Sequence, residues 1–93
     1  MSTASYWTKD PQAVLDYAFD WTAWLGTDLI TQATVTASDA TLIVGAPTIT
    51  DGKVVVWLSG GTVGARPARV TCTITTAGGR TDERTAPIYI QQR

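Results

Sequence analysis

Alternation of apolar and polar side chains with a period of two is the strongest constraint on how this chain folds. It is clearest over residues 69–76, where Val70, Cys72 and Ile74 alternate with threonines. Successive side chains of a β-strand point to opposite faces of the sheet, so the pattern predicts a strand buried on one face only. The chain is therefore expected to be built from half-buried β-strands.

The same alternation returns in short segments that turn-forming residues separate. Further strands are predicted at residues 13–21, 30–38, 42–46, 53–58 and 84–91. The pair Asp51-Gly52 predicts a type I′ hairpin, because that turn needs positive φ at both central residues. Residues 20–26 predict a single helical turn, with Asp20 as the capping residue and Gly26 at its end.

Six or seven short strands at spacings of roughly ten residues predict the fold class. We expect an all-β, antiparallel two-sheet sandwich that is immunoglobulin-like. Residues 1–12 precede the pattern and are predicted to form an extended N-terminal arm, and residues 13–93 the sandwich domain. Trp57, Tyr17 and Phe19 are expected to be the main core fillers, and Trp21 is also expected inside.

The last hairpin allows a prediction of register. A three-residue loop of Gly78, Gly79 and Arg80 would set Val70 opposite Ile88, Cys72 opposite Ala86 and Ile74 opposite Arg84. A two-residue loop would bring polar or non-donating residues onto the core face, so the three-residue loop is favoured.

Composition excludes several classes of chemistry. Among 93 residues there is no histidine, and Cys72 is the only cysteine. The composition therefore excludes nucleophile pairs with histidine, histidine bases, intrachain disulfides and nearly every transition-metal site. No apolar run approaches the ~18 residues of a membrane span, and the N-terminus lacks a signal-peptide pattern, so a soluble protein made in the cytoplasm is expected.

Charge is distributed unevenly along the chain. Residues 1–51 carry six Asp and one Lys (−5), and residues 52–93 carry one Lys and five Arg against Asp82 and Glu83 (+4). The arginines are scattered singly, so nucleic-acid binding is not expected. Either neighbouring strands pair these charges within the monomer, or acidic and basic faces meet between subunits.

Asp82 and Glu83, in the segment Arg80 to Thr85, look at first like a catalytic carboxylate pair. Adjacent residues of a strand point to opposite faces, so the two cannot face one substrate. The other aspartates lack the spacing of a calcium loop, and the Gly-rich residues 59–65 lack the Lys-Ser/Thr of a phosphate-binding loop. We expect no catalytic residues, no cofactor and no metal.

Four tryptophans are more than so small a core can hide. Tyr6 and Trp7 lie in the predicted arm, and exposed aromatic side chains on an arm are typical anchors for a partner protein. Trp24 or Trp7 stacking on a sugar ring is the alternative, which would make the chain a carbohydrate-binding or adhesion module.

Three phrases resemble a family of small bacteriophage virion proteins: residues 14–30 (VLDYAFDWTAWLGTDLI), 54–84 (VVVWLSGGTVGARPARVTCTITTAGGRTDER) and the Thr-rich ATVTAS between them. These proteins are described as fiber-tail adaptors or minor structural proteins of tailed phages and prophages. The resemblance implies an immunoglobulin-like domain that joins components of the tail, neck or fiber without catalysis.

The prediction is therefore a non-enzymatic virion protein, present in the host cytoplasm during assembly. Its expected partners are other phage structural proteins, with several copies in a symmetric ring and with neither nucleic acid nor membrane. Expected contact residues are Tyr6, Trp7, Arg66, Arg69, Arg80 and Arg84. A capsid decoration protein is an alternative role that suits the same features.

Overall fold

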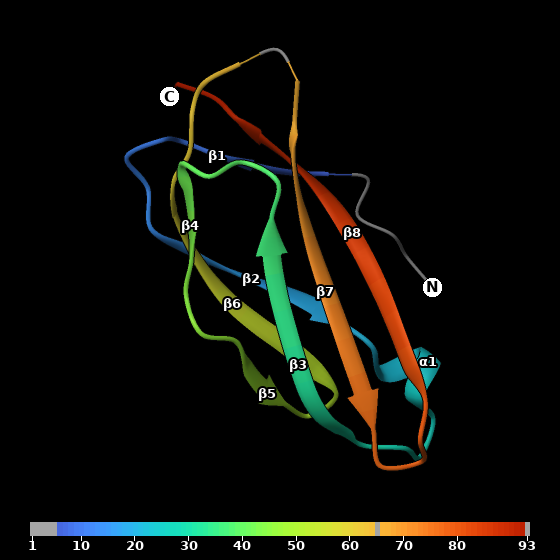
Figure 1. The fold of residues 1–93 in the computed structure, drawn as a ribbon. Coiled ribbons are helices and arrows are strands. Elements are labelled where there is room, and N and C mark those ends of the chain that lie inside the picture. Colours follow the sequence, from blue (N-terminus) through green and yellow to red (C-terminus); the bar gives the residue numbers. More distant parts are fainter. Residues whose placement is uncertain (1–5, 65, 93) are drawn as a thin grey trace.

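Two β-sheets packed face to face form the protein, seen in a computed structural model that describes residues 6–64 and 66–92 (Figure 1). The elements in chain order are β1 (Trp7–Lys9), β2 (Leu15–Asp20), α1 (Thr22–Leu25), β3 (Ile30–Ala37), β4 (Leu42–Val44), β5 (Thr48–Thr50), β6 (Lys53–Gly60), β7 (Ala68–Thr76) and β8 (Thr81–Ile90). The first sheet has the order β1-β8-β7-β3, and the second has β2-β6-β4, with β5 also paired to β6.

The predicted all-β two-sheet sandwich is confirmed, but the prediction of six or seven strands is wrong, since the described residues form eight. Two of the eight, β1 and β5, lie outside the ranges predicted as strands. β1 lies within the expected arm and pairs with β8 in parallel, with Trp7 opposite Ile88. A strand of three residues is too short to show a period, and its pairing is a tertiary contact. Residues 1–5 of the expected arm lie outside the described residues.

Lys9 fixes β1 across the end of the sandwich. Its side chain is fully buried, and Nζ donates to the carbonyl oxygen of Gly60 at 2.6 Å and to that of Asp10 at 2.8 Å. Burial lowers the pKa of Lys9, and the charge of Asp10 opposes that shift. The lysine therefore links the edge of the first sheet to the end of β6 in the second.

The core lies between the two sheets, and its residues come from both: Phe19, Trp21, Leu25, Leu42, Val54, Val56, Leu58, Ala68, Val70, Cys72, Ile74, Ile88 and Ile90. Trp21 is inside, as expected, and Tyr17 packs against the core. The prediction that Trp57 fills the core is wrong, because its side chain is 53% exposed. β6 is apolar on both faces, so its alternation could not tell which face meets the first sheet; Val54, Val56 and Leu58 do.

The two hairpin turns differ in how well the sequence predicted them. Asp51 and Gly52 both have positive φ, 49° and 77°, as the type I′ turn requires. In the β7–β8 hairpin the loop is Ala77-Gly78-Gly79, so Val70 faces Ala86 and Cys72 faces Arg84. The predicted register is therefore wrong by two residues, although each side chain keeps its predicted face.

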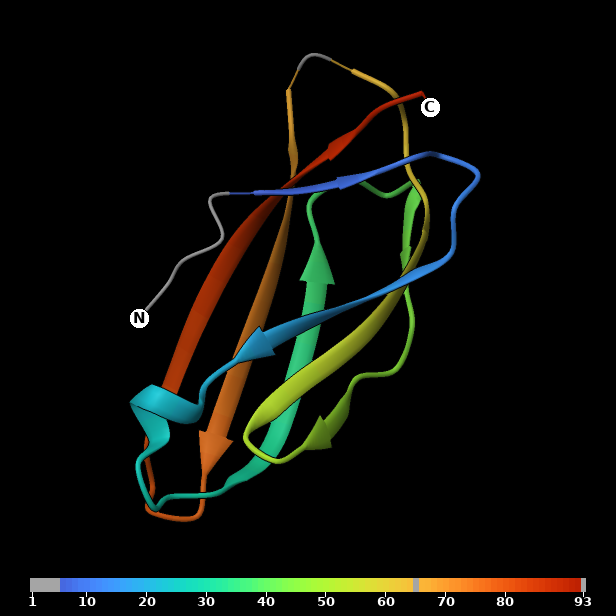
Figure 2. The same ribbon diagram turned by 180° about the vertical axis from the view of Figure 1, so that it is seen from behind.

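A neighbouring loop explains this register. The amide of Thr76 donates to the carbonyl of Arg80 at 2.9 Å, and the amide of Arg80 donates to Oγ1 of Thr76 at 3.1 Å. The carboxylate of Asp28 accepts the amide of Gly78 at 2.9 Å. The predicted helical turn, α1, lies beside this hairpin (Figure 2). Within the described residues no helix is long and apolar enough to cross a membrane.

Candidate partner-binding surfaces

The six predicted contact residues do not form one site. Tyr6, Arg66 and Arg69 lie near the start of β7 and the end of β8. Arg80 and Arg84 contact the segment around α1. Trp7 lies in β1 on the face that meets the core.

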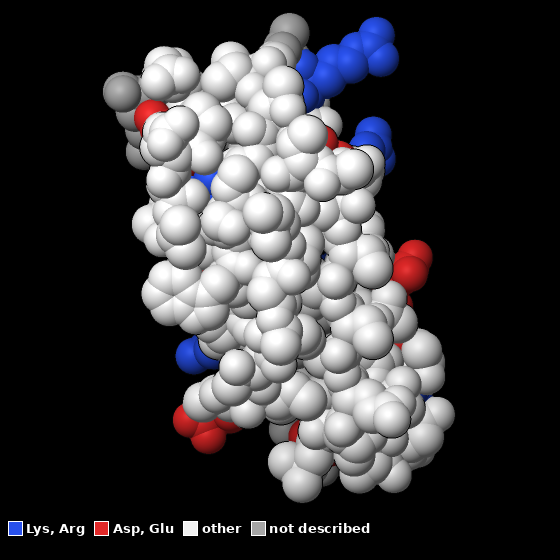
Figure 3. All heavy atoms as spheres, turned by 60° about the vertical axis from the view of Figure 1, so that its left-hand side comes forward, with Lys and Arg blue, Asp and Glu red and all other residues white. Residues whose placement is uncertain are grey.

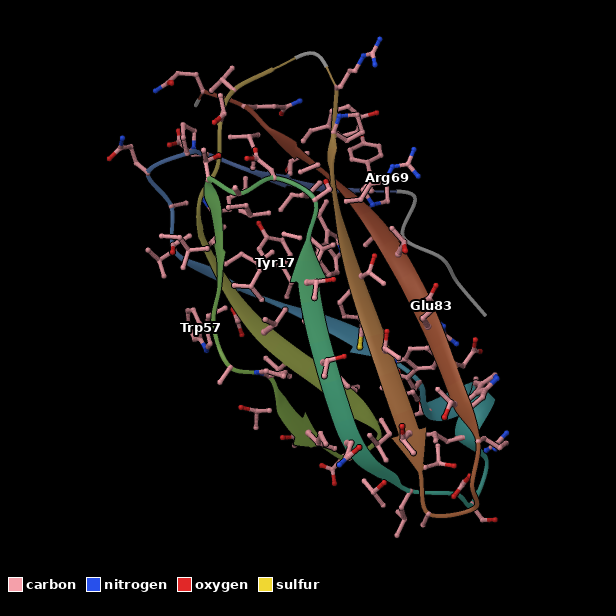
Figure 4. The ribbon with its side chains drawn as sticks, in the orientation of Figure 1. Tyr17, Trp57, Arg69 and Glu83 are labelled. Carbon is pink, nitrogen blue, oxygen red and sulfur yellow. The ribbon has the colours of Figure 1, made fainter. Side chains whose placement is uncertain are left out.

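Aromatic and basic side chains meet on the outer face of the first sheet. Tyr6 is 54% exposed and packs edge-on against Tyr89, with 5.3 Å between ring centroids. Arg69 points outward from β7 (Figure 4) and lies opposite Pro87 on the neighbouring strand. Tyr89 follows Pro87 by two residues and therefore lies on the same face. Arg66 is exposed in the loop that leads into β7. Tyr6, Arg66, Arg69, Pro87 and Tyr89 are called the tyrosine–arginine patch below.

Trp7 is only partly buried, yet its ring is engaged within the chain. Its centroid lies 4.7 Å from that of Tyr17 and 5.0 Å from that of Phe19. Tyr17 in turn donates its hydroxyl to the carbonyl oxygen of Thr8 at 2.8 Å. These contacts join β1 to β2 and fix where Tyr6 lies.

Arg80 holds the end of α1. Its guanidinium lies 4.0 Å above the ring of Trp24, donates to the carbonyl of Leu25 at 3.0 Å, and pairs with Asp28 at 3.0 Å. The hydroxyl of Thr76, the amides of Leu29 and Gly78, and Arg80 itself lower the pKa of Asp28 to about 2. These interactions satisfy carbonyl groups that a helix end leaves without partners.

Arg84, four residues after Arg80 and within β8, makes a similar set of contacts. Its guanidinium lies 4.1 Å above the buried ring of Trp21, and it donates to the carbonyl oxygen of Asp20 at 2.7 Å. Both arginines that the sequence suggested as contacts therefore interact with the segment around α1. An arginine stacked on an aromatic ring in this way stabilises the fold itself.

Asp82 and Glu83 are opposite Ile74 and Thr73, on opposite faces of the first sheet, as their adjacency predicted. Glu83 lies beside Thr73 and not beside Thr75, because of the shifted register. Within the part of the chain that the structure describes, no cluster of three metal-ligating side chains occurs.

The outer face of the second sheet carries an apolar surface that sequence reasoning missed. Trp57 is 53% exposed and Ile43, on the neighbouring β4, is 62% exposed. Val55 lies on the same face, two residues from Trp57, and the ring of Trp57 points away from the sandwich (Figure 4). No local pattern marked this face as outward; the pairing of β2 with β6, which sets Asp16 opposite Trp57, does so in the structure. Trp57, Ile43 and Val55 are called the Trp57 surface below.

A hollow of about 390 Å³ lies beside α1 and the β5–β6 hairpin, lined by Thr22, Leu25, Gly26, Asp28, Leu29, Ile30, Ile49, Asp51 and Gly52. Of its two carboxylates, Asp28 and Asp51, that of Asp28 is already held by Arg80 and by the amide of Gly78. The lining is mostly apolar, with Leu29 69% exposed. This arrangement is unlike a set of converging acid and base groups.

These features define the class of protein first: a small β-sandwich with aromatic side chains exposed on the outer faces of both sheets. The chain belongs to the family described as Podophage GP4 fiber-tail adaptor protein gp77, whose model matches residues 9–89. The resemblance predicted from the sequence is thereby confirmed, and membership supports a structural role in the phage tail. A search of curated proteins gave no match.

Proposed function

We propose that this chain is a non-enzymatic virion protein that links the tail or neck of a bacteriophage to its fibers through protein–protein contacts. The observation that carries the proposal is the family match over residues 9–89. Other tail and fiber proteins are its partners, and it joins them in the host cytoplasm during assembly. Several copies act together in a symmetric ring.

An adaptor needs two contact surfaces, and the two sheets supply them. The tyrosine–arginine patch lies on the outer face of the first sheet, and the Trp57 surface lies on the outer face of the second. Each offers an exposed aromatic side chain, the kind of residue that contributes most to binding energy at interfaces. One surface binds the tail or neck, and the other binds the fiber.

The remaining predicted residues act indirectly in this scheme. Trp7 positions Tyr6 through its contacts with Tyr17 and Phe19, while Arg80 and Arg84 hold the segment around α1. The sandwich itself is proposed to be immunoglobulin-like. Its pairing of β3, β7 and β8 in one sheet, with β2, β6 and β4 in the other, supports that assignment.

Phage particles assembled with variant adaptors test the proposal. Arg66→Ser combined with Arg69→Ser removes the charge of one surface, and Trp57→Ser removes the ring of the other. We expect one variant to be missing from purified tails and the other to be retained on tails that lack fibers. Electron microscopy and mass spectrometry of the particles measure both outcomes.

Lys53→Ser is the matched control for Trp57→Ser, because Lys53 is exposed at the start of the same strand. It should give normal particles. Normal particles from both test variants would contradict the proposal, and adaptor found on capsids instead of tails would favour the decoration role. The carbohydrate alternative needs the ring of Trp24 or Trp7 to stack on a sugar. The structure favours it less, because Arg80 covers one face of Trp24, and Tyr17 and Phe19 pack against Trp7.

A further inference from the structure

β3 is an open edge of the first sheet, and its residues 33–37 lack the usual protection against pairing. It is the outermost strand of the sheet order, and its eight residues, Ile30–Ala37, contain neither a charge nor a proline. Natural proteins commonly protect edge strands with charges, prolines, bulges or short length. The irregularity in β3 lies between Ile30 and Gln32, which leaves Ala33 to Ala37 regular.

The other edges of the two sheets have such protection. β1 is only three residues long. β2 carries Asp16 and Asp20, both exposed. The edge formed by β4 and β5 is interrupted at residues 45–47, which include Pro47. β3 is thus the long, regular, uncharged edge among those that the structure describes.

The backbone of β3 presents alternate residues to the open side. The amide of Ser38 donates to the carbonyl oxygen of Arg69 on β7 at 2.9 Å, so these two residues form a hydrogen-bonded pair. Thr36 and Thr34, which lie two and four residues earlier, are opposite Thr71 and Thr73. Hydrogen-bonded and non-hydrogen-bonded pairs alternate in an antiparallel ladder. The N–H and C=O groups of Ala33, Val35 and Ala37 therefore point toward the open edge.

The sequence of this segment is a palindrome, Ala33-Thr34-Val35-Thr36-Ala37. We propose that a second copy of the chain pairs with β3 in the antiparallel sense, across a two-fold axis at Val35, so that two four-stranded sheets become one continuous sheet. Ala33 then faces Ala37 of the second copy, and Thr34 faces its Thr36. In this register, the N–H and C=O groups of Ala33, Val35 and Ala37 that point to the open edge form hydrogen bonds with the second copy.

Both faces of the joined sheet keep their character in this register. Thr34 and Thr36 lie on the outer face with Thr71 and Thr73, and the partly buried Ala33, Val35 and Ala37 lie on the core side. Opposed threonines on neighbouring strands hydrogen-bond favourably. A shift by one residue would place core-side alanines against outward threonines. A shift by two would keep the faces but set Val35 against Ala37, so the matched pairs of the palindrome favour the register centred on Val35.

The surroundings of β3 do not oppose this contact. The side of the molecule on which β4 and β5 lie has its charged side chains mainly at the margins (Figure 3). Ile43 and Ile49, which come from these two strands, are 62% and 39% exposed. Two copies that meet along β3 thus avoid like-charge repulsion. A two-fold contact closes on itself, so a larger ring needs a second contact elsewhere.

Paired charge changes test the contact in solution by sedimentation velocity over a range of protein concentrations. The unchanged chain is expected to sediment as a dimer. Thr34→Lys with Thr36→Lys places lysine opposite lysine in the proposed register, so about half the wild-type mass is expected. Thr34→Glu with Thr36→Glu should give the same result, and an equimolar mixture of the two variants should recover the dimer.

The control variant, Thr81→Lys with Thr85→Lys, places the same charges on exposed residues of β8, away from the edge. It should remain dimeric. The proposal is overturned if the unchanged chain is a monomer at about 100 µM, far above typical specific dissociation constants. It is equally overturned if the lysine variant stays dimeric, if the control dissociates, or if the mixture fails to associate.

Discussion

At the scale of single residues, two tryptophans differ in burial and therefore in their expected contribution to stability. Trp21 is fully buried beneath the guanidinium of Arg84, whereas Trp57 is 53% exposed. We predict that Trp21→Ala lowers the free energy of unfolding by ~3–5 kcal/mol, because it opens a cavity in the core. Trp57→Ala should cost less than about 1 kcal/mol, because its ring already meets water.

Urea denaturation followed by circular dichroism measures both losses. The two variants serve as controls for each other, since each removes the same indole. A cost at Trp57 equal to that at Trp21 would show that the second sheet presents its other face to the core.

At the scale of elements, the turns that end β6 and β7 depend on glycines with positive φ. Gly79 has φ 86°, and a Cβ there would meet nothing within 4 Å. Gly61 has φ 99°, and a Cβ there would lie 2.7 Å from Cδ1 of Ile90. We predict that Gly79→Ala costs about 1–2 kcal/mol from its backbone conformation alone.

Gly61→Ala should cost more, because displacing Ile90 adds a packing penalty of about 1–3 kcal/mol. Thermal unfolding of both variants checks the order. Gly79→Asn is the control for the backbone effect, since asparagine adopts positive φ more readily than alanine. A smaller loss at Gly61 than at Gly79 would be inconsistent with the observed contact between the loop and β8.

At the scale of the whole molecule, three aspartates make the free energy of unfolding depend on pH. Asp20 and Asp39 each accept the hydroxyl and the amide of a threonine two residues later, Thr22 and Thr41, and these bonds lower their pKa values. The pKa of Asp28 falls from 3.8 to about 2. A carboxyl whose folded pKa lies below its unfolded pKa stabilises the fold above the unfolded value.

This stabilisation is lost as the pH falls from about 4 toward 2, when the folded carboxylates become protonated. We predict a lower urea midpoint at pH 2 than at pH 5, and a smaller pH-dependent change in Asp28→Asn. Measuring the midpoint at several pH values in both proteins checks this. An unchanged midpoint across that range would show that these hydrogen bonds do not persist in solution.

Local pattern was enough to predict the parts of the fold that depend on neighbours in the chain. The half-buried strands, the helical turn after Asp20 and the positive φ of Asp51-Gly52 all follow from residue type and spacing. The same reasoning separated Asp82 from Glu83, because adjacent strand residues point apart. The family was likewise recognisable from continuous phrases of sequence.

Contacts between distant residues decided the rest. β1 exists only because β8 offers it an edge, and the Gly78 amide held by Asp28 helps to set the register of the last hairpin. Which face of β6 is buried depends on its pairing with β2, so Trp57 became a surface residue. The sequence alone determined the longer strands and the phage family, because both can be recognised from residues close together in the chain. Only the tertiary structure decided which arginines are engaged internally and which edge stays open, because these depend on strands that meet across the chain.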